Sequence, residues 1–180
     1  RQDRQAKFPS PNGLEKARAC SARVAQRFGV RTIDLPLLKI WYKESDHHSL
    51  YLLDVRRPEE YCAGHLRGSI SAPGGQLVQA TDKYIGTMGA RIVLIDDTGV
   101  RAIMTASWLV QMGWSNVVVL RDGLSNSDLL VGRYQLTIFG LDEVNTSLVT
   151  PKHLKHLLAE GNAAVIDIAT SREYRKGHIP

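Results

Sequence analysis

The residues best placed for chemistry in this sequence lie in one short polar loop, whose members are Asp96, Asp97, Thr98, Gly99, Val100 and Arg101. The loop follows the apolar run Ile92–Ile95 and leads into a helical pattern, which predicts a tight strand-to-helix turn. Such a turn directs backbone N–H groups and the positive end of a helix at one point, and this makes an anion site. A nucleophile at the first position would be activated by the same field. That position holds Asp96, a carboxylate.

Two further polar segments are expected near this loop. Asp54 and Arg56 come at the end of the buried-strand pattern Leu50–Val55, and Arg121–Gly123 follows the apolar run Val117–Leu120. Continuous apolar runs that alternate with helical patterns are typical of a parallel sheet covered on both faces. Ligands of such sheets bind beyond the carboxyl ends of the strands. We therefore expect the three segments to gather at one edge of the sheet.

Cap residues and apolar spacing predict the remaining elements. We expect short strands at 30–33 and 69–72 and helices at 11–28, 35–42, 58–63, 76–88 and 102–112. Six side chains are expected to be buried on these elements: Cys20, Leu38, Trp41, Tyr42, Trp108 and Trp114.

Composition and charge exclude several kinds of function. The net charge is +5, but the basic residues are scattered and form no stripe interleaved with aromatics, so nucleic-acid binding is not expected. A preference for small anions or acidic partners is the milder inference. No apolar run approaches the roughly 18 residues that cross a bilayer, so no membrane partner is expected. The start, Arg1–Gln5, has neither an initiator Met nor the apolar core of a signal peptide, which suggests a piece of a longer protein.

The cysteines and histidines do not form a metal-ligand pattern. Cys20 and Cys62 each stand alone, so we expect no disulfide, no metal and no cofactor, and a cytoplasmic location. Cys62 is expected to be a bystander to any chemistry. His47 and His48 are adjacent in a polar segment, which favours a solvated turn over a pair of ligands.

The sequence repeats itself at a spacing of 113 residues. Leu53-Asp54-Val55 reappears as Ile166-Asp167-Ile168, and the segment 60–66, with Gly64-His65, reappears as 173–179, with Gly177-His178. An internal repeat of this kind indicates two copies of one structural unit. His65 and His178 lie beside a turn in each copy, which suggests hydrogen bonding to the local backbone rather than acid–base work.

The repeat divides the chain into four parts. We expect a helical extension at 1–29, a complete domain at 30–133, a linker at 134–147 and the start of a second, truncated domain at 148–180. The counterpart of Asp96 in the second copy would come after Pro180.

These motifs resemble the rhodanese (thiosulfate sulfurtransferase) superfamily, and the tandem arrangement resembles its multi-domain members. The matching segments are Leu53-Asp54-Val55-Arg56, Glu60-Tyr61-x-x-Gly64-His65-Leu66-x-Gly68-Ser69-Ile70, Ile92–Ile95 with Gly99-x-Arg101, and Gly113-Trp114 with Val118-Val119-Leu120-x-x-Gly123. The resemblance implies a three-layer α/β fold in which a central, mostly parallel five-stranded sheet carries helices on both faces.

The resemblance also implies transfer of a sulfane sulfur. A cysteine that opens a Cys-x-x-Gly-x-Arg loop would attack thiosulfate, carry the sulfur as a persulfide and pass it to an acceptor such as cyanide. Here Gly99 and Arg101 match, but Asp96 replaces the cysteine, and a carboxylate cannot hold a persulfide. We therefore expect no catalytic residue in the complete domain and no partners beyond a small sulfur-containing anion or acceptor and adjacent rhodanese domains of the same chain.

Four residues are expected to support the loop: Asp54, Arg56, Glu60 and His65. For Asp54 and Arg56, structural hydrogen bonding is favoured over ligand binding. For Arg101 two roles remain open, which are steering an anion and pairing with the carboxylate of Asp96.

The leading hypothesis is a non-catalytic module of a multi-domain sulfurtransferase. The alternative is a regulatory module, or one that binds a protein or an anion, with no part in sulfur transfer. A third possibility, a hydrolase related to dual-specificity phosphatases, is disfavoured because it needs a cysteine in a longer loop.

Overall fold

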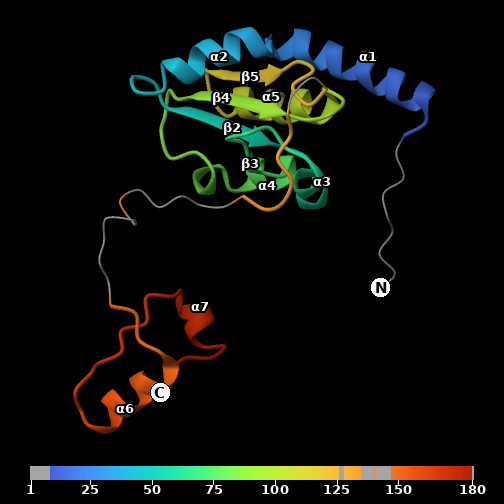
Figure 1. Ribbon diagram of the computed structural model, residues 1–180. Coiled ribbons are helices and arrows are strands. Elements are labelled where there is room, and N and C mark those ends of the chain that lie inside the picture. The colour runs from blue at the N-terminus through green and yellow to red at the C-terminus, as the bar shows by residue number, and fades with distance from the viewer. Residues whose placement is uncertain (1–8, 126–127, 135–139, 141–146, 180) are drawn as a thin grey trace. The chain divides into compact units, whose positions relative to one another are not determined.

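Five short strands form one parallel sheet in the computed structural model, which describes residues 9–125, 128–134, 140 and 147–179 (Figure 1). Its strand order is β1-β5-β4-β2-β3, and every pairing between these strands is parallel. The expected five-stranded sheet is thus confirmed. The strands are β1 (Arg31–Ile33), β2 (Leu50–Asp54), β3 (Ile70–Ser71), β4 (Arg91–Ile95) and β5 (Val117–Leu120).

Helices cover both faces of this sheet, as expected from the resemblance. Alternate strand residues point to opposite faces, so Leu52 packs with Leu38 of α2 (Leu35–Lys43), whereas Leu53 packs with Leu109 of α5 (Val100–Gln111). Leu77 of α4 (Gly74–Gln79) joins the α5 side. The three-layer α/β architecture follows from this alternation.

The register of the central strands brings the polar segments together. Asp54 at the end of β2 lies beside Ile95 at the end of β4, and the N–H of Val55 donates to the carbonyl of Ile95 at 2.9 Å. The short helix α3 (Pro58–Ala63) follows directly from β2. Asp54, Arg56 and the loop that begins at Asp96 therefore share the carboxyl edge of the sheet.

The first helix, α1 (Pro11–Phe28), has the predicted ends but not the predicted buried face. Ser10 caps its start, and Gly29 ends it in the left-handed conformation at φ 66°. The helix packs against α5. Ser21 is buried in this contact while Cys20 is exposed, so the expectation of a buried thiol is wrong. The two residues are adjacent on the helix, and only a narrow strip of α1 is covered.

Three other expectations are corrected. The helix predicted at 76–88 is broken: α4 ends at Gln79, and a single 3-10 turn, η1 (Thr81–Lys83), follows. The break occurs because the Thr81 hydroxyl donates to the carbonyl of Leu77 at 2.9 Å and because Ile85 turns into the core. Trp108 is 54% exposed on the outer side of α5, and Tyr42 is 39% exposed. The indole and the phenol therefore lie outside the core, whereas Leu38 and Leu109 fill it.

The chain divides into two compact units, Arg1–Gln135 and Leu136–Pro180. The second unit contains α6 (Pro151–Ala159), which Thr150 caps, and the short helix α7 (Ser171–Tyr174). No helix among the described residues is long and apolar enough to cross a membrane.

The second unit repeats the local geometry of the first. Tyr61 stacks on His65 with ring centroids 3.9 Å apart, and Tyr174 stacks on His178 at the same distance. In both pairs the histidine Nδ1 contacts the tyrosine carbonyl, at 3.0 and 2.9 Å. The predicted backbone bonding of both histidines is confirmed.

Candidate functional site

The side chain of Asp96 is the centre of the loop that follows β4. It is only 4% exposed, and its two oxygens receive three hydrogen bonds. Oδ1 accepts the N–H of Gly99 at 2.7 Å, while Oδ2 accepts the N–H of Arg101 and the hydroxyl of Thr98, both at 3.0 Å. The carboxylate therefore sits where the donors of the turn converge.

Gly99 makes this geometry possible. It caps α5 in the left-handed conformation, with φ 79°, which residues with a Cβ rarely adopt. Because the chain turns at this residue, the N–H groups of Gly99 and Arg101 both point to Asp96. The sequence prediction of an anion cradle is thus realised in the loop, with a side chain of the protein itself as the anion.

The environment of Asp96 acts on its pKa in two directions. Burial raises the pKa of this carboxyl, because the charged form loses its hydration. The hydrogen bonds from Gly99, Thr98 and Arg101 favour the charged form and oppose the shift, but burial outweighs them.

The guanidinium of Arg101 is held by two other carboxylates. It donates to Glu60 at 2.7 and 3.2 Å and to Asp97 at 2.7 Å. Burial acts to lower the pKa of Arg101, but these bonds outweigh it and raise the pKa above its ordinary value. Of the two roles left open, pairing of the guanidinium with the Asp96 carboxylate is wrong: only the backbone N–H of Arg101 reaches it.

Glu60 connects the loop to α3. One of its oxygens also accepts the N–H of Arg57 at 2.9 Å, which closes a capping box at the start of the helix. The hydrogen bond from Arg101 lowers the pKa of Glu60 to about 2, against the opposing effect of burial. Glu60 is therefore a charged clamp between the two segments.

Asp54 and Arg56 form a buried pair at the same edge of the sheet. Arg56 Nη2 lies 2.6 Å from Asp54 Oδ2 and also donates to the carbonyl of Gly64 at 2.6 Å. Asp54 is fully buried. The two side chains bind each other, and Arg56 also binds the backbone of the turn before His65. This agrees with the structural role favoured from the sequence.

The structure adds one residue that the sequence reasoning missed. Arg18 of α1 donates from Nε to the carbonyl of Thr98 at 3.2 Å, so the first helix contacts the Asp96 loop. These residues are 80 positions apart, and no pattern in the sequence links them.

Cys62 lies on α3, half-buried, and its carbonyl accepts the N–H of Gly132 at 2.9 Å. The three donors to the Asp96 carboxylate come from Thr98, Gly99 and Arg101, so the Cys62 thiol has no place in this cradle. Within the described ranges, no three His, Cys, Asp or Glu side chains are grouped closely enough to hold a metal ion.

A parallel five-stranded sheet, with a donor-rich loop between a central strand and the helix that follows it, defines the rhodanese-like class of α/β domains. The chain belongs to this family: the model of the rhodanese-like domain matches residues 38–127. A search of the curated proteins found no match.

Solved structures agree with this assignment. A thiosulfate sulfurtransferase from Pseudomonas aeruginosa is 46% identical with a TM-score of 0.84, over 97% of this chain and 32% of that protein. The chain thus spans about a third of the length of that relative. The Alr3790 protein from Anabaena sp. is 20% identical with a TM-score of 0.50, over 56% of this chain and 80% of that one, and shows the fold alone.

Proposed function

We propose that residues 30–133 form a non-catalytic rhodanese-like domain of a multi-domain sulfurtransferase, and that residues 148–180 begin a second such domain. The sulfur chemistry of the parent protein then belongs to a neighbouring domain with a cysteine in the equivalent loop. The 46% identity to a much longer thiosulfate sulfurtransferase supports this arrangement. So does the recurrence of the Tyr–His stack in both units. The free thiols of Cys20 and Cys62 support a reducing, cytoplasmic setting.

The observation that carries the proposal is the bonding of Asp96. Sulfane transfer requires a thiolate that attacks the outer sulfur of thiosulfate, forms a new S–S bond and releases sulfite with the electron pair of the old one. An acceptor such as cyanide then takes the outer sulfur and restores the thiolate. The carboxylate of Asp96 offers no sulfur for this bond, and it already uses the N–H groups of Gly99 and Arg101 that would stabilise the anion.

The same bonding disfavours the alternative of an anion-binding module at this loop. A second anion would have to compete with a buried carboxylate for the donors of Gly99, Thr98 and Arg101. A role in binding a protein partner is instead tested by the capture of candidate partners with the native chain and with Asp96→Ala.

A thiosulfate-to-cyanide assay on residues 1–180 tests the proposal. We expect no thiocyanate above the protein-free rate, with an active rhodanese as the positive control. Turnover that survives in a Cys20→Ala, Cys62→Ala double variant would contradict the idea that chemistry needs a loop cysteine. Turnover lost in that variant would show that one of these thiols is catalytic, which would also overturn the proposal.

A further inference from the structure

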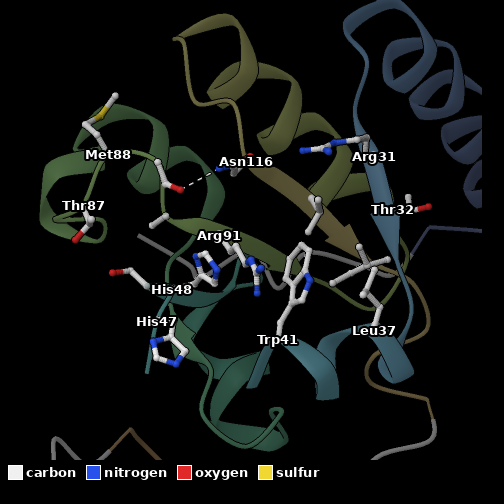
Figure 2. A pocket seen from close by; sticks show the side chains of 15 residues that line it. Arg31, Thr32, Leu37, Trp41, His47, His48, Thr87, Met88, Arg91 and Asn116 are labelled. Carbon is white, nitrogen blue, oxygen red and sulfur yellow. Dashed lines mark hydrogen bonds between the residues drawn. The ribbon is translucent and has the colours of Figure 1, made fainter. Parts of the chain in front are cut away.

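A pocket of about 700 Å³ opens at the edge of the sheet opposite to the Asp96 loop (Figure 2). Its walls include Arg31 and Arg91, which are the first residues of β1 and β4, and Ser49 and Asn116, which directly precede β2 and β5. Since the strands are parallel, these positions mark the amino edge of the sheet. The pocket is thus separate from the carboxyl edge that carries the Asp96 loop.

The two arginines belong to the sheet face that α2 covers. Arg31 is two residues before Ile33, and Arg91 is two residues before Val93, so each arginine shares a face with a core residue. Both Ile33 and Val93 pack in the α2-side core. The pocket is therefore the open end of this core, where the apolar layer gives way to two cations.

Arg91 is held in place from two sides. Its guanidinium lies 4.8 Å from the centre of the Trp41 ring, and Nη1 contacts Glu44 at 2.5 Å. Its side chain is 22% exposed. Among the residues that the structure describes, none hydrogen-bonds to Nε or Nη2 of Arg91. A planar guanidinium fixed by an aromatic ring, with free donors, suits a carboxylate or sulfonate.

The charge and polarity of the walls define the occupant further. Two arginines and two histidines line the pocket, and none of the lining residues is acidic. His47 and His48 come from the loop after α2. In the view of Figure 2, the Arg91 side chain lies between those of His48 and Trp41. The rest of the wall includes an apolar set: Ile33, Leu37, Trp41, Met88 and Val118.

We infer that this pocket binds a small organic anion with a flat apolar body. The anionic group contacts Arg91, with Arg31 adding to the positive field, and the body packs against the exposed apolar side chains of the wall, Leu37 and Met88. An inorganic anion can bind Arg91 but has no apolar body to contact the wall. A neutral aromatic molecule can contact the wall but has no charge for Arg91. This inference does not depend on the proposed absence of catalysis at Asp96, because no residue is shared between the two sites.

The test uses naphthalene-2-sulfonate as the probe. Sulfate serves as a comparison that has the charge but no apolar body, and 2-naphthalenemethanol as one that has the aromatic body but no charge. Titration calorimetry on residues 1–180 gives the affinities, and ¹⁵N NMR follows the side-chain N–H signals of Arg91 and Trp41. We expect the sulfonate to bind at least about tenfold more tightly than either comparison compound and to shift both signals. Equal affinity for the probe and for either comparison compound would overturn the inference, as would NMR shifts confined to other residues.

Two variants, one at Arg91 and one at its partner Glu44 outside the pocket lining, should change the affinity in opposite directions. Arg91→Gln is expected to weaken binding of the probe about tenfold or more, because the charged fork is lost. Glu44→Gln is expected to tighten it about threefold, because a competing carboxylate is removed from Nη1. The matched control is Arg23→Gln on the exposed side of α1, outside the pocket, with no change expected.

A structural role for Arg91 alone would give a different pattern. If the arginine only fastens Trp41 and Glu44 to the sheet, Arg91→Gln will lower the melting temperature but leave probe affinity equal to that of the native chain. Should Arg91→Gln fail to fold, Arg31→Gln replaces it, since this side chain is held less tightly: among the described residues it donates to the carbonyl of Ser115 alone, at 3.2 Å. Unchanged affinity in the folded arginine variant, or weaker binding by Glu44→Gln, would overturn the inference.

Discussion

Arg101 binds Asp96 through its backbone N–H, at 3.0 Å, while its guanidinium is engaged by Glu60 and Asp97. Arg101 thus performs two tasks with different parts of the residue. The backbone of Arg101 stabilises the buried carboxylate, and its charge ties α5 to α3. The positive charge is consequently not free to attract an anionic sulfur donor.

Replacement of the central carboxylate by a thiol should restore only a trace of sulfur chemistry. For Asp96→Cys we expect weak persulfide formation with thiosulfate, because the N–H donors remain but the charge of Arg101 is occupied by Glu60 and Asp97. Mass spectrometry of the intact protein would show a small fraction heavier by one sulfur atom. Turnover at the full rate of an active rhodanese would show this prediction wrong.

The Asp96 carboxylate should also stabilise the fold. Asp96→Ala leaves the N–H groups of Gly99 and Arg101 without their acceptor at the start of α5, and we expect a loss of about 1–2 kcal/mol in the free energy of unfolding. The expected loss is modest because burial already makes the charged form of Asp96 costly. Urea unfolding measures the change. The control is Asp97→Ala, for which a loss as large as that of Asp96→Ala would argue against a special role for the buried carboxylate.

The clamp formed by Glu60 predicts a specific pH dependence. The pKa of Glu60 is about 2 in the folded chain against an ordinary value of 4.5, so the folded state favours its charged form. This contribution is complete above about pH 4.5 and is lost as the pH falls toward 2. Arg101 is 35% exposed, so solvent screening limits the contribution to about 1–2 kcal/mol.

The comparison of native chain and Glu60→Gln checks this dependence. The variant should be less stable at pH 7, and the two urea midpoints should converge as the pH falls from about 4.5 toward 2. Glu59→Gln, at the exposed neighbouring position, serves as the control. A difference that stays constant over this pH range would refute the proposed clamp.

The buried pair of Asp54 and Arg56 should be the most sensitive part of this edge. Arg56→Met leaves the buried charge of Asp54 without its cation, although the backbone N–H of residue 56 can still donate to it, and we expect a loss of about 3–5 kcal/mol in urea unfolding. The double variant Asp54→Asn, Arg56→Met should recover part of this loss. Arg57→Met, in a half-exposed pair, should change stability by less than about 1 kcal/mol. Equal losses in the single and double variants would mean that the unpaired charge is not the cause.

Much of the fold could be predicted because the relevant signals are local. The strand Ile92–Ile95 is buried on both faces and is therefore continuously apolar, and the ends of α1 are set by the adjacent cap residues Ser10 and Gly29. The bonding of the loop backbone to Asp96 follows from the same local logic, since the donors lie within five residues of it.

The errors arose where packing between distant segments, or a side-chain bond to the backbone, decides the structure. Glu60 and Arg101 are 41 residues apart, and only the folded sheet brings the β2–α3 connection beside the start of α5. Trp108 has a large apolar side chain of the kind that usually fills a core, but its face of α5 lies away from the sheet. The break after Gln79 reflects a threonine hydroxyl that bonds back to Leu77, a competition that apolar spacing does not reveal.

The stacked pair of Tyr61 and His65 has a consequence for how such domains are made. Its ring contact and its bond to the tyrosine carbonyl span only four residues, and the same pair, Tyr174 and His178, is complete in a unit whose described residues contain no strand. Contacts of such short range close within microseconds, long before strands from distant parts of the chain can pair. In the first unit, this pair can therefore form during synthesis on the ribosome before β4 and β5, which follow it in the chain, have been translated.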